Sequence, residues 1–262
     1  MWDVDMWDID MWDIDKLDLD AYLTRIGYGG PRTPDARTLR AVHLAHVRAI
    51  PFENLDVILG REILLDLGSL QDKLVTGGRG GYCHEHNLLF AAALERLGFT
   101  VTRHLARIRL GRRHLPRSHA TLTVQADGRT WLADVGFGGD GLVAPMPFED
   151  GATLESGPWR WRLGRDDGFW VLHAGETELY AFRPDEPHFP SDFEVANFYV
   201  SRNPHSPFTR HVLVQRTTAD ARIRLQDHTF TTAPDLTRRL TTELALHLPP
   251  ADVEALLPHL RQ

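Results

Sequence analysis

Cysteine is almost missing from this chain of 262 residues, in which Cys83 stands alone. A single cysteine excludes an intramolecular disulfide, and a free thiol is typical of a reducing compartment. Long apolar runs are missing too, so the sequence has no segment of transmembrane length and no basic-then-apolar leader. We therefore expect a cytoplasmic protein with no membrane partner.

An excess of positive charge is also missing. The formal net charge is −7 at pH 7, which argues against a nucleic acid as partner. Arginine nevertheless gathers in residues 103–117, with six arginines and two histidines. We interpret this stretch as a solvated strand edge and loop. The alternative is that some of its charges attract phosphates or an acidic substrate.

The lone cysteine lies in the segment Arg79-Gly80-Gly81-Tyr82-Cys83-His84-Glu85-His86-Asn87. Residues 83–97 contain neither glycine nor proline, their apolar positions follow a helical period, and Gly98 ends the pattern. Cys83 is therefore expected in the first helical turn, where free N–H groups and the helix dipole favour a thiolate. We interpret it as a nucleophile. The alternative is an inert, buried cysteine.

A β-hairpin supplies the partners that such a nucleophile needs. Residues 118–125 and 130–136 read as strands around the turn residues Asp127 and Gly128, so paired residue numbers sum to 255. Asp134 is then opposite Thr121, and His119 lies diagonal to Asp134 at roughly 7–8 Å along the backbone. The carboxylate of Asp134, in an otherwise apolar strand, needs a partner if it is buried. The alternative for His119 is a structural role, since the chain has 14 histidines.

Two other motifs do not indicate a cofactor. His84-Glu85-His86 lacks the spacing of a zinc-binding helix, because residues two apart on a helix point away from each other. Residues 136–141 match the dinucleotide pattern G-x-G-x-x-G, but the following Leu-Val-Ala-Pro-Met-Pro cannot open the required helix. We expect no metal and no bound cofactor.

The chain resembles the arylamine N-acetyltransferase family, which includes the related amide synthases of ansamycin-type polyketides. The likeness runs over roughly residues 17–210. It is carried by the cysteine segment and by these further blocks: Leu19-Asp20-Ala21-Tyr22-Leu23, Pro51-Phe52-Glu53-Asn54-Leu55-Asp56, Asp134-Val135-Gly136-Phe137-Gly138 and Asn197-Phe198-Tyr199.

The resemblance implies a ping-pong acyltransferase. Cys83 matches the acyl-accepting nucleophile, His119 its base, and Asp134 the carboxylate that orients the imidazole. Acetyl-CoA is then the donor substrate, and an arylamine or hydrazine nitrogen is the acceptor.

The resemblance also assigns supporting residues. It implies substrate and CoA binding at Gly136, Phe137, Gly138 and Phe52. It implies structural support of the site by three polar residues, namely Arg79, Glu53 and Asn87.

The expected fold class is α+β, with a cysteine-protease-like or transglutaminase-like core. The resemblance implies an N-terminal helical bundle (17–98), a central β-barrel (99–190), and a bridging helix with a small α/β lid (191–262). The repeats Met-Trp-Asp-Val-Asp, Met-Trp-Asp-Ile-Asp and Met-Trp-Asp-Ile-Asp precede them. We expect residues 1–16 to be a poorly ordered acidic extension; in the alternative, its tryptophans dock on the body or on a partner.

The alternative functions differ in the acyl donor or in the class of protein. After Phe208 the family signature fades, and we expect a C-terminal part that is shorter than usual in the family. A short lid would suit an amide synthase that takes a polyketide from a carrier protein and cyclises it by attack of an internal arylamine. A non-catalytic binding domain predicts a degraded triad, and a thiol protease does not account for the blocks around Glu53 and Gly136. The sequence predicts no oligomeric state.

Overall fold

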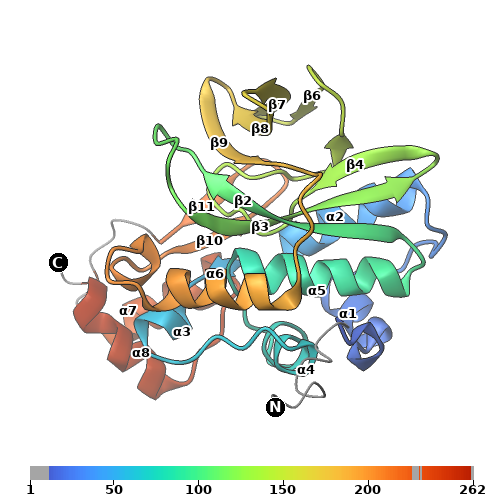
Figure 1. Ribbon diagram of the computed structural model, residues 1–262. Coiled ribbons are helices and arrows are strands. Elements are labelled where there is room, and N and C mark those ends of the chain that lie inside the picture. Colours follow the sequence, from blue (N-terminus) through green and yellow to red (C-terminus); the bar gives the residue numbers. More distant parts are fainter. Residues whose placement is uncertain (1–11, 226–229, 231, 261–262) are drawn as a thin grey trace, which may run out of the picture.

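The computed structural model describes residues 12–225, 230 and 232–260 (Figure 1). Its helices are α1 (Leu19–Arg25), α2 (Ala36–Ala49), α3 (Leu55–Ile58), α4 (Leu67–Leu70), α5 (Cys83–Arg96), α6 (Pro190–Arg202), α7 (Ala233–Arg238) and α8 (Pro250–Leu256). Short 3-10 helices lie at Ile14–Lys16, Pro207–Thr209 and Leu257–Leu260, and π-helical turns at Gln71–Thr76 and Arg239–Glu243.

The strands form two antiparallel sheets. They are β1 (Phe52–Glu53), β2 (Thr100–Ile108), β3 (Arg117–Ala126), β4 (Arg129–Ala133), β5 (Met146–Pro147), β6 (Thr153–Ser156), β7 (Trp159–Asp166), β8 (Phe169–Ala174), β9 (Thr177–Phe182), β10 (Val214–Thr217) and β11 (Arg222–Arg224). The large sheet has the order β5-β4-β3-β2-β9-β8-β7-β6, and its edge strands β5 and β6 approach each other. It is therefore nearly a closed barrel, and the α+β prediction is confirmed.

The helix and the hairpin predicted to carry the site are both present. Helix α5 begins at Cys83 and runs to Arg96, and Gly98 follows with φ of 90°. In the hairpin, Ala126 pairs with Arg129 and Leu122 with Ala133, so the predicted register is confirmed. Asp127 and Gly128 have φ of 51° and 70°, as a two-residue type I′ turn requires.

The site is positioned by a layer of helices beneath the barrel. In Figure 1, α5 and α6 lie below β2 and β3, and both helices contact β3. Helix α5 is buried almost all round, and its apolar residues join those of α1, α2 and β3 in one core. A second core fills the curved sheet around Tyr180 and Leu163. Because α5 and β3 share a core, side chains at their facing ends are held together.

The C-terminal part is tied to the N-terminal half by a strand that the sequence did not reveal. Strand β1 pairs with β10, which pairs with β11, and Phe52 lies opposite Gln215. A third core joins Leu55 to apolar residues of β10, α7 and α8. The change from helices to strands falls at Gly98, and α6 begins at Pro190. The division into three domains stays a prediction.

Only the end of the N-terminal repeat lies within the described residues. Trp12 packs edge-on against Phe193 with ring centroids 5.4 Å apart, and Asp15 pairs with Arg96 at 3.0 Å. The expectation of poor order for residues 1–11 falls outside the described residues. In the part of the chain that is described, no helix is long and apolar enough to cross a membrane.

Candidate active site

Cys83 is the first residue of α5 and lies where that helix meets the start of β3. Its Sγ is 3.6 Å from the carbonyl oxygen of Ser118, and the residue is 4% exposed. Residue Tyr82 caps the helix, with its backbone N–H donating to Glu85 Oε2 at 3.0 Å. The sulfur therefore lies at the positive end of the helix dipole, where a negative charge is stabilised.

His119 and Asp134 are in direct contact beside this sulfur. The distance from His119 Nε2 to Asp134 Oδ2 is 2.6 Å, and both residues are 1% exposed. Because Nε2 is engaged by the carboxylate, Nδ1 is the ring nitrogen left for the Cys83 thiol. The imidazole is held between Tyr180 and Phe137, with ring centroids 4.7 and 5.1 Å away. The hairpin and α5 thus bring the three predicted triad residues together.

Asp134 is held by donors to its second oxygen. Asn87 Nδ2 and the backbone N–H of Gly136 donate to Oδ1 at 2.9 and 3.0 Å. Asn87 also donates to the Ala120 carbonyl at 2.7 Å and so connects α5 with both strands of the hairpin. Burial raises the pKa of Asp134, but His119 and these hydrogen bonds outweigh it, and the net pKa is lowered. The carboxylate is therefore charged and fixed in orientation.

The charge of His119 follows from the same contacts. Burial lowers its pKa, whereas Asp134 and then Cys83 raise it by charge and hydrogen bonding, and the resulting pKa is about 9. His119 is therefore an imidazolium at neutral pH, next to the sulfur of Cys83. A positive imidazole ring beside the sulfur is the arrangement found around cysteine nucleophiles.

The raised pKa of His119 predicts a loss of stability at alkaline pH. The shift from 6.5 to about 9 corresponds to roughly 3 kcal/mol of stabilisation. That contribution is fully present below the unfolded pKa of 6.5 and is lost as the pH rises through about 9. Urea unfolding between pH 6 and 10 measures it, with His119→Gln as reference. The stability difference between wild type and variant should shrink over this range; a constant difference would contradict the prediction.

A buried ion-pair network holds the segment that precedes Cys83. Arg79 donates to Glu53 Oε1 through Nε and Nη2 at 2.9 and 2.7 Å, and Glu53 is 0% exposed. Lys73 lies 2.7 Å from both Glu85 and Asp56. Burial lowers the pKa of Lys73, but these carboxylates outweigh it and raise the pKa. The network therefore joins α5 and the chain that leads to it with β1 and α3.

A chain of neutral hydrogen-bonded groups supports α5 from below. Tyr22 Oη lies 2.8 Å from His46 Nδ1, and His46 Nε2 lies 2.9 Å from His86 Nδ1. His86 Nε2 is 3.2 Å from the Pro51 carbonyl, which can only accept, so each group in this chain donates toward Pro51. Burial lowers the pKa of His86 to about 4, which keeps it neutral. The tautomers of both imidazoles are thereby fixed.

Gly80, which precedes Cys83, lies so close to another segment of backbone that a side chain would not fit there. A Cβ at Gly80 would lie 2.0 Å from the Pro51 carbonyl oxygen and 2.8 Å from Glu53 Cγ. Gly80→Ala should therefore lower the free energy of unfolding by about 1–3 kcal/mol. The matched control is Gly29→Ala, because a Cβ there meets nothing within 4 Å, and its change should stay within about 1 kcal/mol. Urea denaturation of both variants tests this, and equal stabilities would contradict it.

A cleft of about 580 Å³ opens in front of Cys83 and His119. Its walls combine apolar rings with cationic groups; among the lining residues are Phe52, Ile108, Leu110, Phe137, Tyr199 and Phe208, and Arg109, Arg112, Arg210 and Arg224. The exposed Arg112 and Arg210 have no carboxylate partner among the described residues. The cleft can therefore hold an extended ligand with an apolar part and an anionic part.

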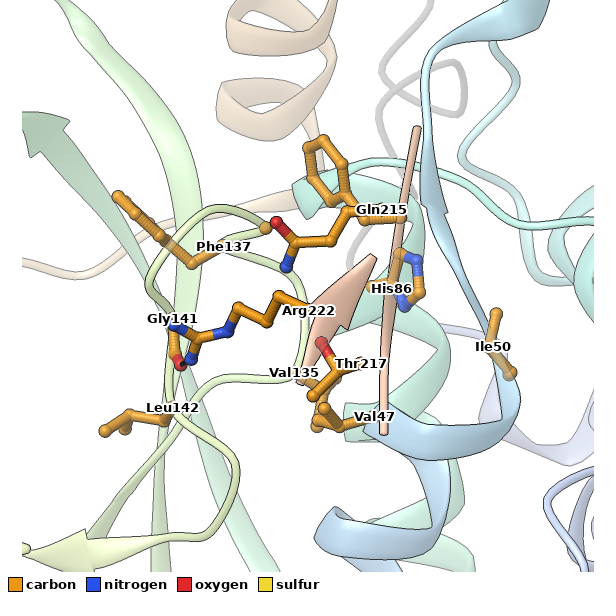
Figure 2. A pocket seen from close by; sticks show the side chains of 12 residues that line it. Val47, Ile50, His86, Val135, Phe137, Gly141, Leu142, Gln215, Thr217 and Arg222 are labelled. Atoms are coloured by element: carbon orange, nitrogen blue, oxygen red, sulfur yellow. Dashed lines mark hydrogen bonds between the residues drawn. The ribbon is translucent and has the colours of Figure 1, made fainter. Parts of the chain in front are cut away.

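A second, water-sized cavity of about 20 Å³ lies on the other side of the Phe137 loop. Figure 2 shows Phe137, Gly141 and Leu142 on one side of it, with His86 and the C-terminal residues Gln215, Thr217 and Arg222 around the rest. Arg222 donates to Asp140 and to the Gly141 carbonyl at 2.9 and 2.6 Å. The C-terminal sheet thus braces the loop that carries Phe137.

The residues expected to bind substrate are distributed over both cavities. Phe52 and Phe137 line both cavities, whereas Gly138 lines only the small cavity. Gly136 packs against α5, where a Cβ would lie 2.9 Å from Asn87 Nδ2 and from the Cys83 carbonyl oxygen. Gly136 lines neither cavity, and its position serves the close packing of the loop on α5.

The arginine-rich stretch is less solvated than the sequence suggested. Arg103 is 6% exposed and is bonded to Glu95, and Arg109 is 5% exposed between Asp166 and Glu178. The interpretation of this stretch as a solvated edge is therefore wrong for these two residues. They lie on or beside the long strand β2, which is covered on both faces.

Several residues of the site were missed by sequence reasoning. His43 Nε2 accepts the backbone N–H of Asp134 at 3.2 Å, and burial lowers the pKa of His43 to about 4. Tyr180 covers the imidazole from β9, and Lys73 neutralises Glu85. The role of Glu85 could have been found from the sequence, because an acidic residue three positions after the N-cap is typical of a capping box. His84 is buried, and its ring nitrogens have no hydrogen-bond partner among the residues described.

Comparisons with known proteins agree with this architecture. A family profile described as N-acetyltransferase matches residues 35–257. The arylamine N-acetyltransferase of Escherichia coli K12 is 39% identical over 217 residues, covering 80% of this chain and 77% of that protein. The corresponding protein of Mycolicibacterium smegmatis is 43% identical, with 78% of each chain covered.

Solved structures extend the likeness to more of the chain. The Nocardia farcinica arylamine N-acetyltransferase matches with a TM-score of 0.85 and 40% identity, covering 95% of this chain and 96% of that one. The Mycobacterium marinum arylamine N-acetyltransferase in complex with CoA matches with a TM-score of 0.87 and 29% identity, covering 94% of this chain and all of that one (100%). The expectation of a shortened C-terminal part stays a prediction. The chain belongs to the arylamine N-acetyltransferase family.

Proposed function

We propose that this chain transfers the acetyl group of acetyl-CoA to the nitrogen of an arylamine or hydrazine, through a thioester on Cys83. The observation that carries the proposal is the buried contact between His119 and Asp134 beside the only cysteine, at the bottom of a cleft. The relatives named above support it, since they are arylamine N-acetyltransferases.

In the first half-reaction the Cys83 thiolate attacks the thioester carbonyl of acetyl-CoA. The tetrahedral intermediate collapses with cleavage of the bond to the CoA sulfur, and the CoA thiolate takes the proton from His119 Nδ1. Acetyl-Cys83 and a neutral imidazole remain. Backbone N–H groups in the first turn of α5 are suited to stabilise the oxyanion.

In the second half-reaction the amine nitrogen attacks acetyl-Cys83. Neutral His119 takes the proton of the amine, and the bond to Sγ breaks, which returns the thiolate–imidazolium pair and releases the amide. Asp134 keeps the imidazole oriented through Nε2 in both steps. Phe137 and Phe52 offer apolar surface for the aromatic ring, and the cationic groups of Arg112 and Arg210 suit the phosphates of CoA.

Arg79, Glu53 and Asn87 act as supporting residues in this proposal. Their hydrogen bonds connect the start of α5 with β1 and with Asp134. The amide-synthase alternative is not favoured, because the relatives named above are arylamine N-acetyltransferases and one of them was solved in complex with CoA.

The deciding experiment is the mass of the intact protein after brief incubation with acetyl-CoA in the absence of amine. We expect the gain of one acetyl group, located on Cys83 by peptide mapping and discharged by added aniline. A sample alkylated at Cys83 beforehand is the control and should gain none. A folded protein that gains no acetyl group while its thiol still alkylates rapidly would overturn acetyl-CoA as the donor.

A further inference from the structure

Helix α6 presents an apolar face that no described segment covers. Val195, Phe198 and Tyr199 are 73%, 71% and 36% exposed, and their spacing of three and four places them on one side of the helix. Leu64, 50% exposed, is next to Ile63, whose carbonyl accepts from Asn197 Nδ2 of α6 at 2.9 Å. We call these four residues the α6 ridge. Exposed apolar side chains that gather in this way are typical of a contact surface.

The third copy of the N-terminal repeat already binds at the start of this helix. Trp12 meets Phe193 edge-on at 5.4 Å, and the Arg103 guanidinium lies 4.3 Å from the centre of its indole ring. Asp15 of the same copy pairs with Arg96 at 3.0 Å. In this copy the tryptophan therefore contacts an aromatic ring and a guanidinium group, and an aspartate pairs with an arginine.

The first two copies carry the same chemistry and lie within reach of the ridge. Trp7 precedes Trp12 by five residues, which span up to about 17 Å of extended chain. Phe198 follows Phe193 by five residues of helix, which is a rise of about 7.5 Å and a rotation of about 140° from the buried to the exposed side of α6. We propose that residues 1–11 run along α6, with the Trp7 indole on Phe198 and Val195 of the α6 ridge.

The charges on residues 1–11 and on α6 favour one direction for this segment along the helix. Residues 1–11 contain four aspartates and no lysine or arginine. Glu194 flanks the early part of the exposed face, whereas Arg202 lies at its end. Arg202 donates to the Gly60 carbonyl at 3.3 Å and has no carboxylate partner among the described residues. An acidic segment that starts at Trp12 is thus drawn toward Arg202.

The tether favours this occupant over a second copy of the chain. A segment joined to Trp12 has a high effective concentration at the α6 ridge. A second copy of the chain would reach the same occupancy only at a high protein concentration. Tyr199 belongs to the ridge and also lines the large cleft. Residues 1–11 would therefore border the mouth of the cleft as well.

Photo-crosslinking from the ridge tests the proposal without relying on enzyme activity. Phe198 is replaced by p-benzoylphenylalanine in the full chain, and the irradiated protein is mapped by mass spectrometry. An equal mixture of unlabelled and nitrogen-15-labelled chains separates cross-links within one chain from those between chains. We expect cross-links to residues 1–11 within one chain, and a yield at least about fivefold lower when Trp7→Ala is added.

The matched control carries the same photoreactive residue at Trp170. This position is partly exposed on β8, in the upper part of Figure 1, away from α6. It should give no cross-link to residues 1–11. Cross-links only between chains would make a second copy the occupant and overturn the proposal. A folded protein without cross-links at position 198, or with equal yields at both positions, would overturn it too.

Discussion

Acetyl transfer should fall by roughly 10⁴-fold or more when Cys83 is replaced by alanine. The chain has no second thiol that could accept the acetyl group, and His119 and Asp134 without Sγ have no nucleophile to activate. Steady-state assays with acetyl-CoA and aniline measure the loss. Retention of more than about a hundredth of the wild-type rate would contradict the role of Cys83.

The same variant should remain folded, which makes the loss interpretable. Cys83 opens a helix, so alanine keeps the helical backbone, and only the sulfur and its 3.6 Å contact with the Ser118 carbonyl are removed. We expect a loss of about 1 kcal/mol in the free energy of unfolding. Cys83→Ser is the matched control. It keeps a side chain of similar shape with a hydroxyl in place of the thiol and should be as inactive as the alanine variant, because a hydroxyl with this partner is a far weaker nucleophile.

The arrangement of Cys83, His119 and Asp134 could be predicted because each part of it depends on local rules. A run without glycine or proline fixes the start of α5 just at Cys83. The turn residues Asp127 and Gly128 fix the register of the hairpin, and that register sets His119 diagonal to Asp134. Strand periodicity places both side chains on one face. The packing of α5 on β3 then brings together two apolar surfaces that are separated in the sequence by β2 and its loop.

The contacts of His43 and of strand β1 could not be predicted, because their partners are far away in the sequence. Asp134 lies 91 residues from His43, and Phe52 of β1 pairs with Gln215 of β10. No local pattern links such segments; their contacts appear only once the cores have formed. The burial of Arg103 was missed although Glu95 is only 8 residues away, because Glu95 lies on α5 and Trp12 comes from the N-terminal segment.

Asp134→Asn should slow acetylation of Cys83 by roughly 10²–10⁴-fold, for a reason specific to the imidazole. The Asn amide can keep the contacts that Asp134 Oδ1 makes with Asn87 and with the Gly136 N–H. Its nitrogen would then face His119 Nε2 and donate to it, which forces the proton of a neutral imidazole onto Nδ1. That nitrogen could no longer accept the proton of Cys83. Loss of the carboxylate also removes the main cause that raises the pKa of His119.

A pH profile distinguishes this role from simple structural support. Alkylation of Cys83 by iodoacetamide at pH 7 should be at least about tenfold slower in Asp134→Asn and should recover as the pH rises, because hydroxide then removes the thiol proton without His119. Asp252→Asn is the matched control, since Asp252 is 8% exposed and pairs with Arg61 at 2.6 Å, far from the triad in sequence. Its alkylation should follow the wild-type profile. If Asp134→Asn follows that profile as well, Asp134 does not control the protonation of His119.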